Sequence, residues 1–244
     1  MVAPDPVAEA ARNGEPDRYL SALYAPEPAR GRMIALGAFA ADLARIAAAV
    51  REPMLAEIRL QWWRDALGAA QRGEVTGHPI ADRLAPDLAS GLLPVGLLLG
   101  MTDAAPRPDL AELAADGQAL KALLGKREGA AFALAARALG ATHADGIESA
   151  AEACGFAYGL ARLLIAAPAL DPVLRGQLAA RCRAVLPEAA TSASRLDSAL
   201  LPAFLPLSMT STYLSQADGG AAAGTMPLRR WFRLWRASLS GRLI

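Results

Sequence analysis

Apolar residues recur along most of the chain at intervals of three and four, the spacing that places them on one face of an α-helix. No run shows the alternation of apolar and polar residues that is typical of a half-buried β-strand. Proline, glycine and aspartate residues mark where helices begin and end. The expected helices cover residues 17–24, 29–50, 52–72, 80–90, 92–101, 109–139, 145–167, 171–186, 194–216 and 228–239.

The chain of 244 residues is long enough to bury one sizeable core, and its helices show no internal repeat or change of composition. We therefore expect an all-α, single-domain helical bundle. Residues 1–16 carry several acidic side chains and no apolar core, which argues against a signal peptide and predicts a flexible N-terminus. The domain is then expected to cover residues 17–244.

The formal net charge of +1 excludes a global attraction to nucleic acid. Cys154 and Cys182 lie in apolar helical patterns without a CxxC spacing, so we interpret them as reduced core thiols in a cytoplasmic protein. The apolar segment 198–217 has the length of a membrane span, but it contains Pro202 and Pro206 and is expected to be a buried helix.

Candidate metal ligands are few. His78 and His143 lie in expected surface loops without a cysteine or carboxylate at ligand spacing. Pairs of carboxylates four residues apart on a helix could hold Mg²⁺, although their polar neighbours favour solvated faces. These pairs are Asp5/Glu9, Glu112/Asp116 and Glu148/Glu152. We predict no metal site and no cofactor.

Several segments resemble the squalene/phytoene synthase family. The first is Glu52-Pro-Met-Leu-Ala-Glu-Ile-Arg-Leu-Gln-Trp-Trp-Arg-Asp65, together with residues 18–24 and 30–41 before it. The second, Gly155-Phe-Ala-Tyr-Gly-Leu-Ala-Arg-Leu-Leu-Ile165, is similar to that family's helix with the pattern G-x-A-x-Q-L-x-N-I-L-R-D, and residues 128–140 resemble the helix before it. The resemblance covers about residues 18–240 and implies a helical bundle of the trans-isoprenyl diphosphate synthase, or terpenoid synthase, type.

Enzymes of this family join two prenyl diphosphates head to head, and two aspartate motifs hold the Mg²⁺ ions that assist departure of the diphosphate. Alignment on Phe39 and Gly155 places apolar residues at all four aspartate positions. These residues are Ala44, Ala48, Ala166 and Leu170. The family's glutamine and asparagine in the second helix become Gly159 and Arg162, so the resemblance implies that the catalytic residues are missing.

These departures are similar to those of a non-catalytic branch, the bacterial relatives of mitochondrial complex I assembly factors. The resemblance favours a pseudoenzyme that acts as an assembly or scaffold factor for a membrane respiratory complex, with a subunit or intermediate of that complex as partner. Two alternatives stay open. One is an active head-to-head prenyltransferase with Mg²⁺ on unusual ligands such as Glu148 and Glu152, and the other is an isoprenoid- or lipid-binding protein.

Residues that could bind a ligand or partner come from the two similar segments and their neighbours. They are Phe39, Arg45, Arg59, Trp62, Trp63, Tyr158, Gly159 and Arg162. We expect Trp62 to fill the core and Trp63 to border a surface or cavity, because adjacent helical residues point about 100° apart. Gly155 and Gly159 would let another helix approach closely. We favour a cavity filled by neighbouring side chains over one that holds a lipid.

The last expected helix is amphipathic, with leucine and aromatic residues on one side and arginines on the other. This pattern suits attachment to an anionic membrane surface, which would place the protein on the inner face of the cytoplasmic membrane. The membrane-surface candidates are Arg229, Arg230, Trp231, Arg233, Trp235 and Arg236. The alternative is a final helix that docks on the domain and leaves its arginines in water.

Overall fold

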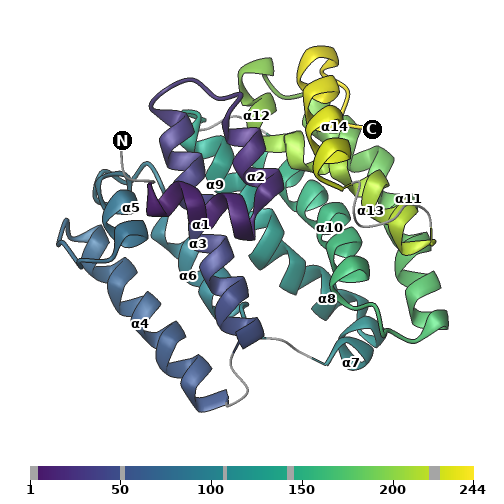
Figure 1. Ribbon diagram of the computed structural model, residues 1–244, viewed down its shortest axis with the longest axis horizontal. Helices are drawn as coiled ribbons and strands as arrows, with labels where there is room; N and C mark the ends of the chain where they lie inside the picture. Colours follow the sequence, from purple (N-terminus) through teal and green to yellow (C-terminus); the bar gives the residue numbers. More distant parts are fainter. Residues whose placement is uncertain (1–4, 50–52, 107–108, 142–145, 220–225) are drawn as a thin grey trace. The chain divides into compact units, whose positions relative to one another are not determined.

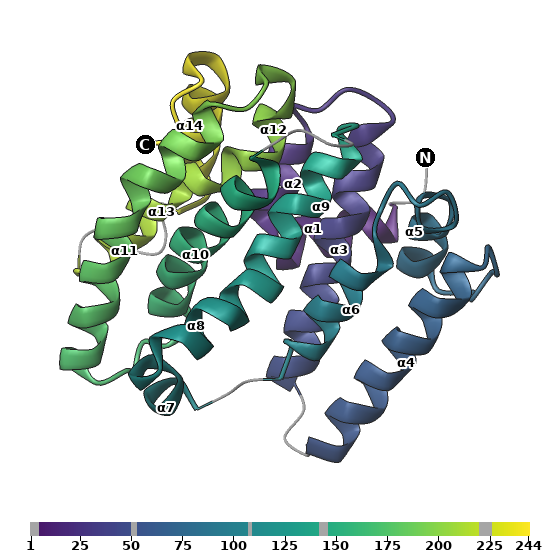
Figure 2. The same cartoon turned by 180° about the vertical axis from the view of Figure 1, so that it is seen from behind.

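A computed structural model describes residues 5–49, 53–106, 109–141, 146–219 and 226–244. These residues form helices joined by turns, without a strand among them (Figures 1 and 2), which confirms the predicted all-α fold class. The α-helices are α1 (Pro6–Gly14), α2 (Pro16–Ala22), α3 (Ala29–Ala49), α4 (Pro53–Gln71), α5 (Pro79–Ala89), α6 (Val95–Asp103), α7 (Leu110–Ala115), α8 (Gly117–Leu124), α9 (Ala130–Ala138), α10 (Ile147–Ala166), α11 (Pro172–Ser194), α12 (Leu201–Phe204), α13 (Thr210–Ala217) and α14 (Met226–Ser240). A π-helical turn, Gly125–Gly129, separates α8 from α9, and 3-10 turns flank α12.

The chain folds into two compact units. The first consists of Met1–Arg107 and Leu134–Thr142, and the second of Pro108–Ala133 and His143–Ile244. The chain passes between the units three times, and α9 begins in the second unit and ends in the first. That residues 17–244 act as one domain stays a prediction.

In the first unit, α1 packs against α3 (Figure 1). Asp5 caps α1 by accepting a hydrogen bond from the backbone N–H of Val7, and the side chains of Val7 and Ala11 are buried. A β-carbon added at Gly14 would lie 2.4 Å from the β-carbon of Ala41, so the two helices cross closely there. The prediction of a flexible segment over residues 1–16 is therefore wrong for residues 5–16. The few apolar residues of this segment form too short a pattern to predict a helix that packs on the core.

Helix α4 turns a different face to the core from the one that its sequence suggested. The stripe at every fourth position is mostly solvent-exposed, with Met54 76%, Ile58 59% and Trp62 41% exposed. The side chains that pack inward from α4 are Leu60, Trp63, Ala66, Leu67 and Ala70. The expectation of a buried Trp62 and a bordering Trp63 is wrong, because α4 carries two apolar stripes and its contacts with α5 and α6 select the second.

The second unit is built around α10, which packs against α11, α13 and the π-helical turn and is buried along most of its length. A β-carbon at Gly155 would lie 2.2 Å from the backbone nitrogen of Gly129, and one at Gly159 would lie 2.8 Å from Leu124 Cδ2. The predicted close helix approach at these glycines is confirmed. An aromatic cluster lies beside it, with Phe132 stacked on Phe204 at 5.7 Å between ring centroids.

Other predicted helices differ at their boundaries. The expected helix 109–139 is interrupted, because Asp116 caps a new helix at Gly117 and accepts hydrogen bonds from the N–H groups of Gln118 and Ala119. The expected helix 194–216 divides into 3-10 turns and two α-helices around Pro202 and Pro206. Among the helices in the described part of the chain, none combines the length and the apolar character needed to cross a membrane.

Candidate functional site

In the first unit, the Trp63 indole is the centre of a polar and aromatic cluster. Trp63 is 1% exposed and its ring packs edge-on against Phe39 at 4.9 Å between centroids. Its Nε1–H donates a 2.8 Å hydrogen bond to Asp42 Oδ2 on α3. The exposed side chain of Arg45, one turn further along α3, donates to the other oxygen of the same carboxylate. Asp42 therefore links α3 to α4 through a hydrogen bond, and the positive charge of Arg45 balances the charge of its carboxylate.

A loop histidine completes this cluster. His78 lies 4.9 Å from Trp62 and 5.1 Å from Trp63, measured between ring centroids. Asp82 shapes the loop by accepting hydrogen bonds from the backbone N–H groups of Thr76 and Gly77. These bonds, that of Thr76 first, lower the pKa of Asp82. The half-buried His78 was expected to be a plain surface residue, and its contact with residues 62–63 has no local signal in the sequence.

In the second unit, Arg162 on α10 lies over the ring of Tyr158, with 5.6 Å between its guanidinium carbon and the ring centroid. Arg162 also pairs with Glu128 at 3.4 Å between Nη1 and Oε1. Glu128 reaches this position from the π-helical turn, and such turns often occur at functional sites. Gly159 faces Leu124 and Glu128, so these side chains occupy the space beside it.

Of the four positions that correspond to the expected aspartate motifs, two belong to the first unit and two to the second. Ala44 and Ala48 are exposed on α3, Ala166 is exposed at the end of α10, and Leu170 is half-buried after it. Arg175 donates hydrogen bonds to the backbone oxygens of Leu164 and Ala167, and it thereby places a positive charge at the C-terminus of α10.

The aspartates nearest to these positions already have structural roles. Asp42, two residues before Ala44, binds Trp63 and Arg45. Asp171, next to Leu170, caps α11 by accepting hydrogen bonds of 3.0 Å from the N–H groups of Val173 and Leu174. Both carboxylates are thus engaged by groups of the protein itself.

Three of the six carboxylates in the pairs at helical spacing have similar structural uses. Asp5 and Asp116 cap α1 and α8. Glu152 is exposed and pairs with Lys121 at 3.0 Å, and Glu148 is also exposed on the first turn of α10. Within the described ranges, no three His, Cys, Asp or Glu side chains converge as a metal site would require.

The comparisons with known proteins agree with this architecture. The model of the squalene/phytoene synthase family matches residues 11–169, well over half of the chain. This chain belongs to the squalene/phytoene synthase family. A comparison with curated proteins finds no match. The all-helical fold is that of a terpenoid synthase-type member of the family, as the resemblance implied.

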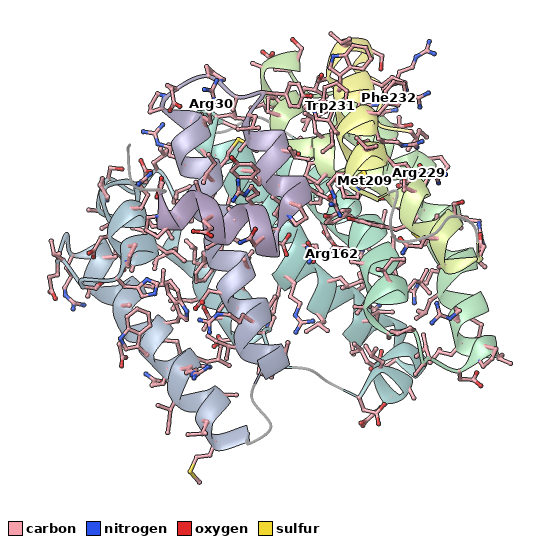
Figure 3. All side chains as sticks on the ribbon, in the orientation of Figure 1. Arg30, Arg162, Met209, Arg229, Trp231 and Phe232 are labelled. Carbon is pink, nitrogen blue, oxygen red and sulfur yellow. The ribbon has the colours of Figure 1, made fainter. Side chains whose placement is uncertain are left out.

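The candidate residues of this family member fall into separate groups. Phe39, Trp62 and Trp63 lie together in the first unit, and Arg45 joins them through Asp42. Arg59 is exposed on α4 outside this cluster. Tyr158, Gly159 and Arg162 form the group on α10 in the second unit (Figure 3 labels Arg162). The sequence did not single out Glu128, which comes from a distant turn.

Exposed apolar side chains on α4 form a surface that we call the α4 patch: Met54, Leu55, Ile58 and Trp62. Figures 1 and 2 show the first turns of α4 extending past the ends of the neighbouring helices α3 and α6. Arg64 links α4 to α6 through Asp103 at 2.9 Å, and it also pairs with Glu57 of its own helix at 2.6 Å. These hydrogen bonds, that of Glu57 first, raise the pKa of Arg64. Exposed Glu57, Arg59 and Asp65 give the surroundings of the patch both signs of charge.

The membrane-surface candidates on α14 differ in their surroundings. Arg229, Arg236, Trp231 and Trp235 are exposed, and Arg230 is half-buried. Arg233 points inward instead: its Nε donates a 2.8 Å hydrogen bond to the backbone oxygen of Ser208 and its guanidinium contacts Ser211. Burial lowers the pKa of Arg233. The expectation that Arg233 lies on the outer surface is wrong, because the helix docks through the side that carries it.

Proposed function

We propose that this protein is a non-catalytic member of the squalene/phytoene synthase family that acts as an assembly or scaffold factor for a membrane respiratory complex of the complex I type. The main support for the loss of catalysis is that Asp42 and Asp171 already bind other groups of the protein. The aspartate positions hold alanine and leucine, and the two nearest carboxylates bind a tryptophan, an arginine and a helix N-terminus.

Ionisation of a prenyl diphosphate requires charge neutralisation on the departing diphosphate, which Mg²⁺ supplies as a Lewis acid. A contact between opposite charges is worth about 4 kcal/mol at intermediate dielectric, and each ~1.4 kcal/mol lost at the transition state lowers the rate tenfold. Freeing Asp42 for a metal would also leave the buried Trp63 N–H without its acceptor. Arg162, already paired with Glu128, does not replace the metal, because an arginine that only binds diphosphate provides no comparable driving force for ionisation.

The α4 patch supports a role in binding a protein. Single exposed apolar residues are common, but a contiguous group of Met, Leu, Ile and Trp on one helix is typical of an interaction surface. The mixed charges of Glu57, Arg59 and Asp65 around it suit a protein partner better than an anionic lipid. The identity of the partner, a subunit or intermediate of the respiratory complex, comes from the resemblance of residues 52–65 to the non-catalytic branch.

The loss of catalysis is tested by incubating the purified chain with Mg²⁺ and farnesyl or geranylgeranyl diphosphate. We expect no release of diphosphate and no head-to-head product above the rate without protein. An active family enzyme measured in parallel shows that the assay works. Turnover that depends on this chain would establish the prenyltransferase alternative and overturn the proposal.

The assembly role is tested by deleting the gene in the source organism. We expect less assembled complex I on native gels and slower NADH oxidation by membranes, and restoration of both by the wild-type gene. A Leu55→Glu, Ile58→Glu variant should fail to restore them, because it places two charges in the α4 patch. Val75→Glu is the matched control, since Val75 is an apolar residue of the same unit that is 85% exposed.

Unchanged complex I after deletion would refute the assembly role. Full complementation by the Leu55→Glu, Ile58→Glu variant would instead remove the α4 patch from the proposal. Both variants change exposed positions, so circular dichroism of the purified proteins should show wild-type helix content.

A further inference from the structure

Helix α14 is held on the second unit by one defined side. Leu234 and Ala237 are buried there, at 0% and 3% exposed, against the 3-10 turn Leu205–Met209. Arg233 lies on the same side and donates its hydrogen bond to the backbone of Ser208 in that turn. Packing and hydrogen bonding together fix the rotation of the helix about its axis, so its outer side is also defined.

The outer side of α14 is apolar and aromatic. At 100° per residue, Leu228, Phe232, Trp235 and Leu239 lie opposite the buried side, and Trp231 lies at its edge. These five residues, which we call the aromatic ridge, are 78%, 54%, 39%, 70% and 54% exposed in that order. The rings of Trp231 and Trp235 stack in parallel, with centroids 6.0 Å apart and an interplanar angle of 4°. Trp231 and Phe232 are labelled in Figure 3.

The charged residues of the segment that carries the ridge have one sign. Residues 226–244 contain five arginines and no acidic residue, although the whole chain carries only +1. The remainder of the chain therefore has a net charge of −4, the difference between +1 and +5. Arg229 and Arg236 are exposed and flank the ridge on one side. This end of the protein is thus positively charged in an otherwise slightly acidic molecule.

We propose that the aromatic ridge docks α14 on the surface of an anionic lipid bilayer. In this arrangement the helix lies in the plane of the interface, with the ridge at the boundary of the acyl chains and Arg229 and Arg236 at the phosphate groups. Tryptophan is one of the aromatic residues that are enriched at this depth, because its ring is apolar and its N–H is polar. Burial of the ridge and attraction of the arginines act in the same direction.

The surroundings of the ridge favour a lipid surface over a protein partner. Helix α4 has carboxylates and arginines beside its exposed apolar residues, as protein interfaces do, whereas residues 226–244, which carry the ridge, have arginines and no carboxylate side chain. The side of α14 that packs on the second unit is the one that carries Leu234 and Ala237, so packing of the helix leaves the ridge exposed. The inference stands independently of the assembly role, because it rests on α14 and can be measured with the purified protein alone.

The test is co-sedimentation of the full chain with vesicles of phosphatidylcholine alone or mixed with phosphatidylglycerol. We expect binding to the anionic vesicles that weakens as salt is raised. Arg229→Gln with Arg236→Gln should weaken this binding about 25-fold, since each arginine near a headgroup contributes about a fivefold factor. Phe232→Ser with Trp235→Ser should weaken it at least tenfold on the same vesicles. Arg12→Gln with Arg195→Gln removes two exposed arginines elsewhere and should leave the binding unchanged.

Failure of the wild-type chain to bind anionic vesicles would overturn the proposal, and so would equal binding of the Phe232→Ser, Trp235→Ser variant. A variant that binds vesicles like the wild type but loses a protein from isolated membranes would show that the ridge docks on protein instead. Circular dichroism of each variant should show that the helices are intact, because all four positions on α14 are exposed.

Discussion

The two adjacent tryptophans of α4 offer the sharpest comparison of side chains in this protein. Trp63 is 1% exposed, contacts Phe39 and donates a hydrogen bond to Asp42, whereas Trp62 is 41% exposed and packs beside the rings of Trp63 and His78. Trp63→Ala should lower the free energy of unfolding by about 3–5 kcal/mol, the cost of emptying a fully buried aromatic site. Trp62→Ala should lower it by about 1 kcal/mol, because its ring contacts are lost while alanine favours the helix slightly.

A third substitution separates packing from hydrogen bonding. Trp63→Phe keeps an aromatic ring in the site but removes the N–H that Asp42 accepts. We expect a loss of about 1–2 kcal/mol, toward the low end for a bond to a charged group, since Arg45 still pairs with the carboxylate. The order of cost is therefore Trp63→Ala, then Trp63→Phe, then Trp62→Ala.

Urea unfolding followed by far-UV circular dichroism measures these differences without relying on the fluorescence of the altered tryptophans. The midpoints should shift while the slopes stay equal, because a change in slope would indicate a change in the surface exposed on unfolding. Equal costs for the two alanine variants, or a larger cost for Trp62→Ala, would refute the assignment of Trp63 to the core. Either outcome would instead favour burial of the face of α4 that carries Trp62, which periodicity alone suggested.

Two further predictions concern α10 and its neighbours. Gly155→Ala should lower the free energy of unfolding, measured in urea, by about 2–3 kcal/mol, because the added β-carbon would meet the backbone of Gly129. Gly176→Ala, at an open site of α11, should instead raise it by about 0.5–1 kcal/mol. Equal effects of the two substitutions would contradict the close crossing at Gly155. Burial raises the pKa of Cys154 and Cys182 to about 12, so between about pH 9 and pH 12 the folded chain binds more protons than the unfolded chain and stability falls as pH rises. The unfolding free energy should decline by up to about 1.4 kcal/mol per pH unit for each thiol, and a Cys154→Ala, Cys182→Ala variant that shows the same decline would argue against this source.

Resemblance and periodicity were sufficient for the broad features of this protein. The spacing of apolar residues predicted helices over nearly all the segments where the structure has them, because a helix that packs on a core must carry an apolar stripe. Residues 52–65 and 155–165 indicated the family, and the apolar character of Ala44, Ala48 and Ala166 is a property of the sequence under that alignment. The cap of α11 by Asp171 was also accessible, since Asp-Pro is a local signal for a helix start.

Tertiary structure decided which of several apolar faces is buried. On α4, two stripes compete, and the helix turns Trp63 inward because α3, α5 and α6 supply partners on that side, including Asp42 at a separation of 21 residues. On α14, Arg233 and Leu234 pack on the second unit and leave the aromatic ridge exposed. A helical wheel shows the two sides of this helix but does not show which of them is buried. Periodicity specifies that a face exists, whereas its orientation depends on contacts between residues far apart in the sequence.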